Sequence, residues 1–259
     1  MKKPVLLSLL LISAAHRSTA ATLIQDDFSG TAGSDLIGTL PETGPGSWAG
    51  NTGFDFATGG GVTNNNTSSG GISATLDMGA AYFSSNPGIY EMTASVFFPA
   101  ATAGTSVIGI GFAATRSAGI SGSFADSGTF GEPWMFLRAN GQVQVRSGAT
   151  TYFSAATPTF ASGSSHILKL VLNTTGSNWT LDAYVNSTQL DLNAGAGSTL
   201  TYGAGASPIA IRYAGITATQ NTGIGTISNF QLTGTIPEPS SAALSSLGLL
   251  ALCVSRKRR

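Results

Sequence analysis

The chain has 259 residues, and only 9% of them are charged, whereas ordinary globular domains have about 25%. Between residues 22 and 234, five basic residues stand against eleven acidic residues, which gives a net charge of −6. That balance leaves no basic patch to neutralise phosphates, so we expect no nucleic-acid partner.

The cysteine and histidine content restricts the chemistry further. Cys253 is the only cysteine, and His16 and His166 are the only histidines. A disulfide in the body, a thiolate metal ligand and a zinc site with several imidazoles are therefore excluded. His166 opens a predicted strand and is expected to face solvent. Core burial must stabilise the body, and we predict no cofactor.

Residues 1–21 have the pattern of a secretory signal peptide. Lys2 and Lys3 precede an apolar run from Val5 to Ala15, which is too short to span a hydrocarbon core about 30 Å thick. Ser18-Thr19-Ala20 then supplies the small residues of a cleavage site. We predict removal of this leader, with a retained N-terminal anchor as the alternative.

Residues 22–234 are predicted to form one all-β body. Abundant Gly, Ser, Thr and Asn favour short strands and many turns over long helices. The glycines of Thr105–Ala114 indicate a curved strand or a close approach of the backbone. Strands are expected in Leu23–Phe28, Ile72–Met78, Gly88–Pro99 and Thr105–Ala114, with short ones around Trp48, Phe54–Phe56 and Val62.

Two hairpins are predicted in the second half of the body. Pro133–Arg138 and Gln142–Arg146 flank Asn140-Gly141, a pair that supplies the positive φ values of a tight turn. His166–Asn173 and Trp179–Asn186 form the second hairpin. Further strands are expected in Thr188–Leu192, Pro208–Ala214 and Ile224–Thr233. Ten to twelve strands without a helical period predict a two-sheet sandwich.

Five segments follow the pattern of a known fold family: Ile24–Phe28, Tyr90–Phe98, Ser165–Leu172, Trp179–Val185 and Ile227–Leu232. Together they resemble the concanavalin A-like, laminin-G-like jelly-roll sandwich. That family often places its first and last strands side by side in one sheet. The resemblance therefore implies that Ile24–Phe28 and Ile227–Leu232 are neighbours, but it implies no particular activity.

Residues 235–259 combine three features. Pro237, Glu238 and Pro239 precede the apolar run Ala242–Val254, which is followed by the basic end Arg256, Lys257, Arg258 and Arg259. This tail resembles the PEP-CTERM sorting signal of bacteria that make extracellular polysaccharide. The resemblance implies that an exosortase, an integral-membrane cysteine protease, recognises the tail and cleaves near the motif.

The physical properties of the tail agree with a temporary anchor. As a transmembrane helix, Ala242–Val254 would cover only about 20 Å at a rise of about 1.5 Å per residue. That is short of a hydrocarbon core about 30 Å thick, and the basic end favours the cytoplasmic side. The alternative is an ordinary short C-terminal anchor that is never cleaved.

The carboxylates do not form the pattern of a hydrolase. Glucanases with this sandwich carry Glu-x-Asp-x-x-Glu, whereas the body has only Glu42, Glu91 and Glu132, none in that pattern. Asp26 and Asp27 are adjacent, so on a strand they point to opposite faces. We predict no catalytic residue; two carboxylates converging within about 6 Å in a groove would favour hydrolysis instead. Calcium at the Asp pair is the one metal candidate, although a single pair is not a site.

Carbohydrate binding combines an aromatic platform with a few polar groups. Trp134, Arg138 and Tyr152 are the candidates for such a site. Trp134 starts a strand and suits either a platform or the core, whereas the alternating strand around Trp179 favours the core.

We therefore predict an exported, non-enzymatic protein of the bacterial cell surface or the exopolysaccharide matrix. It would be anchored through its C-terminal helix and then processed at its sorting tail. A carbohydrate-binding, lectin-like module is the alternative, and a glycoside hydrolase is the third hypothesis.

Overall fold

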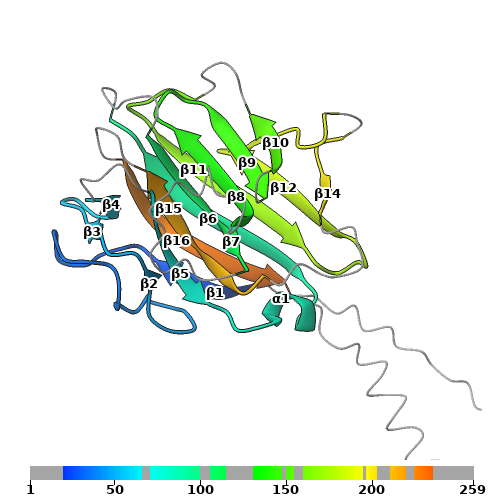
Figure 1. Ribbon diagram of the computed structural model, residues 1–259, viewed down its shortest axis with the longest axis horizontal. Coiled ribbons are helices and arrows are strands. Elements are labelled where there is room, and N and C mark those ends of the chain that lie inside the picture. The colour runs from blue at the N-terminus through cyan, green and yellow to red at the C-terminus, as the bar shows by residue number, and fades with distance from the viewer. Residues whose placement is uncertain are drawn as a thin grey trace, which may run out of the picture. The chain divides into compact units, whose positions relative to one another are not determined.

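The computed structural model describes residues 20–65, 71–99, 106–114, 131–147, 150–154, 160–194, 197–202, 211–219 and 225–235. They form two antiparallel sheets packed face to face (Figure 1), which confirms the predicted all-β, two-sheet sandwich. Residues 1–19 of the predicted signal peptide and the predicted membrane helix, Ala242–Val254, lie outside the described residues.

The larger sheet, called the back sheet here, has the strand order β13-β12-β11-β6-β16-β4-β3. In addition, β1 pairs with β16, and β14 pairs with β12. Its strands are β1 (Ala21–Asp26), β3 (Phe54–Phe56), β4 (Val62–Asn64), β6 (Ile89–Phe97), β11 (Ser165–Asn173), β12 (Trp179–Val185), β13 (Thr188–Gln189), β14 (Leu200–Tyr202) and β16 (Thr226–Thr235).

The smaller sheet, the front sheet, has the order β10-β9-β8-β7-β15-β5-β2. Its strands are β2 (Ala49–Gly50), β5 (Gly71–Asp77), β7 (Val107–Ala113), β8 (Gly131–Arg138), β9 (Val143–Ser147), β10 (Thr150–Ser154) and β15 (Tyr213–Thr219). Both predicted hairpins are confirmed, because β8 pairs with β9 and β11 pairs with β12.

The first and last strands of the described body are neighbours in the back sheet. Ile24 stands opposite Leu232, and Asp26 stands opposite Phe230. This pairing confirms the arrangement that the family resemblance implied, and it ties the two ends of the body to one sheet.

Several local predictions differ from the structure. In the β8–β9 turn only Gly141 has a positive φ, of 82°, and its N–H donates to the carbonyl of Arg138 (2.9 Å). The turn is thus a three-residue loop with one left-handed residue, so Asn140 does not take the positive φ expected of it. The strands β10 and β14 and the four-residue helix α1 (Tyr82–Ser85) were also missed, because such short segments carry no clear period. The strand predicted over Pro208–Ala214 begins instead at Tyr213.

One hydrophobic core fills the space between the sheets. Along β6 and β12 every second residue is buried, so each strand turns one face to the core and the other outward. The largest fully buried side chains of this core include Trp48, Tyr90, Phe28, Phe54, Phe83, Phe112 and Phe230. Burial of these side chains stabilises the fold, whereas many exported domains rely on disulfides for part of their stability.

The central strands of the front sheet, β5, β7 and β15, are almost entirely buried on both faces. All seven residues of β7 are buried. Ile108, Ile110 and Phe112 join the main core, whereas the alternate positions face the opposite side of the sheet. There a second group, the outer cluster, consists of Val107, Ala113, Trp134, Phe136 and Tyr213.

Two glycines of β7 make room for the aromatic side chains of the outer cluster. Gly109 and Gly111 stand opposite Phe136 and Trp134 of β8. A Cβ added at Gly111 would lie 2.5 Å from the Pro133 carbonyl oxygen and 2.6 Å from the Trp134 ring. The rings thus occupy space that side chains on β7 would need, which confirms the predicted close approach.

Gly111→Ala is therefore expected to destabilise the protein by about 1–3 kcal/mol, the usual cost of inserting a group into a packed sheet. Gly46→Ala is the matched control, because a Cβ there meets no atom within 4 Å. Urea unfolding of both variants measures the difference. Equal midpoints would contradict the packing described for β7 and β8.

Candidate functional site

The carboxylate of Asp26 lies at the end of β1 and is only 5% exposed. Trp48 donates its indole N–H to Asp26 Oδ2 (2.6 Å), and the backbone N–H of Phe28 donates to Oδ1 (2.8 Å). The Trp48 ring packs against Phe28 and Phe230, with ring centroids 5.7 and 5.5 Å apart. Both carboxylate oxygens therefore hold core elements in place.

Asp26, Asp27 and Glu42 converge because the chain leaves the strand after Asp26. Phe28 has a positive φ of 59°, and the backbone N–H of Asp27 donates to Glu42 Oε2 (3.0 Å). One carboxylate oxygen from each of the three acidic residues lies within 4.8 Å of the others. Asp26 and Asp27 were predicted to point to opposite faces of one strand. They converge instead, because β1 ends at Asp26 and side chains alternate only within a strand.

Glu42 is brought to this place by a long-range backbone contact that the sequence does not reveal. Gln25 and Thr43 form an isolated bridge, with N–H···O distances of 2.8 and 3.1 Å. Glu42 thereby borders an open cleft of about 360 Å³. The cleft is also lined by Asp26, Ser29, Gly30, Thr31, Ser34, Thr39, Leu40, Pro41 and Phe56.

The three carboxyl groups differ in proton affinity. Burial raises the pKa of Asp26 above its ordinary value of 3.8, although the hydrogen bonds from Trp48 and Phe28 act in the opposite direction. Burial and a hydrogen bond to Asp27 raise the pKa of Glu42. The same hydrogen bond lowers the pKa of Asp27. Glu42 therefore keeps the proton that the pair shares, and Asp27 ionises first.

The carboxyl groups of the cluster meet the distance that would favour hydrolysis. A retaining glycosidase holds its two carboxyl groups about 5–5.5 Å apart on either side of the glycosidic bond. Here one oxygen each of Asp27 and Glu42 lies within 4.8 Å of the other, and Glu42 Oε2 also accepts the backbone N–H of Asp27 (3.0 Å). Oxygen ligands of this kind suit calcium, but calcium takes about six to eight oxygens and the cluster supplies three side chains.

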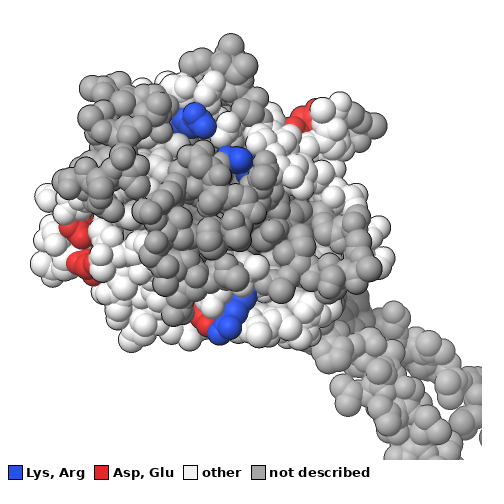
Figure 2. Space-filling model, viewed as in Figure 1, with Lys and Arg blue, Asp and Glu red and all other residues white. Residues whose placement is uncertain are grey.

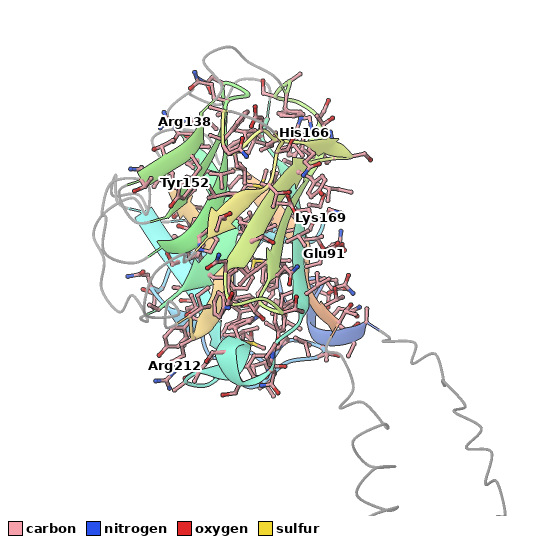
Figure 3. All side chains as sticks on the ribbon, turned by 90° about the vertical axis from the view of Figure 1, so that its right-hand side faces the viewer. Glu91, Arg138, Tyr152, His166, Lys169 and Arg212 are labelled. Carbon is pink, nitrogen blue, oxygen red and sulfur yellow. The ribbon has the colours of Figure 1, made fainter. Side chains whose placement is uncertain are left out.

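The structure separates the three residues predicted to bind sugar. Trp134 and Arg138 lie on the same, outer face of β8, and Trp134 is only 1% exposed. Tyr152 lies on β10, where the pairing with β9 is irregular, and it packs against the main core. Figure 3 shows Arg138 and Tyr152 on one side of the sandwich and Lys169 and Glu91 on the other.

Three further candidate side chains are buried. Trp48 belongs to the main core, and so does Trp179, as its strand pattern predicted. His166 is 8% exposed, with Nε2 2.9 Å from the carbonyl oxygen of Ala161. The expectation that His166 faces solvent was wrong, because it shares the inward face of β11 with Leu168.

The described body ends where the predicted sorting tail begins. The last strand, β16, ends at Thr235. Pro237, Glu238 and Pro239 and the basic end, residues 256–259, lie outside the described residues. Among the residues that the structure describes, no helix is both long enough and apolar enough to cross a membrane.

Comparison with known families identifies this tail. Residues 235–259 match the model of the PEP-CTERM protein-sorting motif. The chain carries a PEP-CTERM sorting motif. The match confirms the resemblance drawn from the Pro-Glu-Pro sequence, the apolar run and the basic end. No curated protein matches the sequence.

Solved structures resemble the body that precedes the PEP-CTERM motif. An endo-1,3-beta-glucanase from Streptomyces sioyaensis has 13% identity and a TM-score of 0.54, covering 87% of this chain and 100% of that chain. A Bacillus subtilis protein with a galectin-like fold has 10% identity and a TM-score of 0.52, with coverage of 84% and 98%. The potassium-bound carbohydrate recognition domain of Emp46p has 12% identity and a TM-score of 0.50, with coverage of 71% and 87%. At these identities the likeness concerns the fold.

Asp26→Asn is expected to destabilise the protein by about 1–3 kcal/mol, since an amide offers one acceptor oxygen where the carboxylate offers two. One of the N–H donors from Trp48 and Phe28 then lies buried beside the new amide group. Asp182→Asn, whose hydrogen bonds are exposed, is the control and should change stability little. Chemical unfolding at neutral pH measures both.

The stability difference between the wild type and Asp26→Asn is expected to depend on pH. Asp26 binds its proton more tightly when folded, so its contribution to stability is full below pH 3.8 and is lost as pH rises through the folded pKa. The stability of the wild type minus that of Asp26→Asn should therefore decrease as pH rises across that window. An increasing difference would contradict the burial of Asp26.

Proposed function

We propose that this protein is a non-enzymatic component of the bacterial cell surface or exopolysaccharide matrix. In this proposal a signal peptide, residues 1–21, directs export, and the helix Ala242–Val254 holds the precursor in the membrane. An exosortase-type protease then processes the PEP-CTERM motif. The match of residues 235–259 to the sorting motif is the observation that carries this proposal.

The position of the motif relative to the fold supports processing. The hydrogen-bonded strand β16 ends at Thr235, and Pro237 follows two residues later. Prolines on both sides of Glu238 disfavour a helix and continued sheet pairing. Because β16 is held between β1 and β6, cleavage within the motif would leave the body intact.

Replacing Arg256–Arg259 with neutral residues, or Glu238 with Ala, is expected to leave full-length precursor in the membrane. The neutral end removes the cytoplasmic retention signal, and the Ala variant alters the motif itself. Mass spectrometry of membrane and secreted fractions distinguishes precursor from product. Glu91→Ala, on the outer face of the body, is the control and should be processed normally. Normal processing of both tail variants would reject the assignment.

The carboxylate geometry supports a role without catalysis. Asp26 accepts hydrogen bonds from Trp48 and Phe28, and Glu42 accepts the backbone N–H of Asp27. Asp26 and Glu42 thus have structural partners, whereas glycoside hydrolysis needs an acid and a nucleophile on either side of the glycosidic bond. The cluster instead joins β1 to the loop that carries Glu42.

Carbohydrate binding is the second candidate function. Arg138 supplies a polar group on the outer face of the front sheet, where the outer cluster forms a buried aromatic backing, and such sites combine apolar and polar groups. Two structures of similar fold are titled a glucanase and a carbohydrate recognition domain. A matrix polysaccharide is accordingly the proposed ligand class.

The full-length exported protein is expected to bind a polysaccharide on a glycan array that includes polymers of its own host. It is also expected to release no reducing ends from any polymer it binds. No signal on the array would reject the binding function. Sugar release that is lost in Glu42→Gln would overturn the non-enzymatic proposal.

A further inference from the structure

The hairpin of β8 and β9 presents two arginines on the outer face of the front sheet. Leu137, Val143 and Val145 point into the main core, so the alternate residues Arg138, Gln144 and Arg146 must face outward. Arg138 and Arg146 are half-buried, neither enclosed in the core nor fully in solvent. The hairpin thus holds two positive charges on one rigid surface.

Neither arginine has an acidic partner among the described residues. The ion pairs there join Lys169 to Glu91 and Arg212 to Asp77. The side chain of Arg138 donates to Gln144 Oε1 (3.2 Å), which is a neutral acceptor. In Figure 2 two basic patches have no described acidic atoms beside them, whereas a lower basic patch touches acidic atoms.

Both guanidinium groups also contain a donor without an acceptor among the described residues. The Nε atoms of Arg138 and Arg146 are buried and find no hydrogen-bond partner there. Leaving a buried donor unpaired costs about 1–3 kcal/mol, and more when it is charged. Arg146 stands opposite Trp134, so Arg138 lies four residues farther along the hairpin, with Gln144 between the two arginines. Buried polar groups normally have a partner, and a ligand with acceptor oxygens would supply one.

The chemistry of the site defines that ligand. A guanidinium is a planar fork that matches the two oxygens of a carboxylate. Arg146 is the cross-strand partner of Trp134, and Gln144 is the partner of Phe136, so buried aromatic side chains adjoin the polar ones. Such low-dielectric surroundings strengthen a charge-assisted hydrogen bond.

We infer that Arg138 and Arg146 form a binding site for the carboxylate groups of an acidic polysaccharide. This inference rests on the proposed carbohydrate-binding function and names its ligand class, a polymer of uronic acids. Gln144 holds Arg138 in position through its Oε1 atom. Trp134 is buried, so it backs the site and does not stack on a sugar ring.

The test measures binding of the full-length exported protein to immobilised polygalacturonate, dextran sulfate and neutral dextran. The double variant Arg138→Lys and Arg146→Lys keeps both charges but removes both forks. It should bind polygalacturonate about tenfold more weakly or worse, as expected when charge-assisted hydrogen bonds are lost. Lys169→Gln, a charge change on the opposite sheet, should bind like the wild type. Lys keeps an aliphatic stem, so an unchanged melting temperature verifies the fold.

The outcomes separate this inference from the function on which it rests. If the wild type and the Arg→Lys double variant bind neutral dextran equally well, the inference is overturned. The proposed sugar-binding function would still stand. Equal binding of dextran sulfate and polygalacturonate that does not change in the Arg→Lys variant would show attraction by charge alone. That result would also overturn the inference. Failure of every polymer to bind would overturn both.

Discussion

A buried hydrogen bond between Asp26 and Trp48 connects the edge of the sandwich to its core. Asp26 closes the first strand, which lies on the last strand, β16, and the Trp48 ring rests against Phe230 of that same strand. Because Cys253 is the only cysteine, no disulfide can secure this junction. Burial raises the pKa of Asp26, so the stability that this junction contributes depends on pH.

The two sheets differ in how many of their faces are buried. The back sheet buries one face only, so its strands alternate and its outer face carries polar residues such as Lys169 and Glu91. The central strands of the front sheet are buried on both faces, and this requires small residues where aromatic side chains cross them. Gly109 and Gly111 meet that need beside Phe136 and Trp134. Strand β7 therefore uses glycine to make room for aromatic side chains of β8. The β8–β9 hairpin carries two arginines on the same outer face.

The charges of the molecule fall into separate groups with separate roles. The tail concentrates its basic residues after an apolar run, within the sorting motif. In the body, Asp26, Asp27 and Glu42 converge at one end of β1, whereas Arg138 and Arg146 lie on the front sheet without acidic partners among the described residues. Because only 9% of the residues are charged, few neighbouring charges neutralise the electric field of each group.

The sequence alone determined most of the strand pattern, the two hairpins and the sorting tail, whereas the family resemblance implied the pairing of the first and last strands. The features read from the sequence depend on neighbours in the chain: alternation of apolar residues, an Asn-Gly turn, and the order of motif, apolar run and basic end. Only the tertiary structure placed Glu42 beside Asp26, turned His166 inward, and moved Tyr152 away from Trp134. Those contacts join residues far apart in the sequence through sheet register and backbone turns, and no local pattern encodes which long-range partners meet.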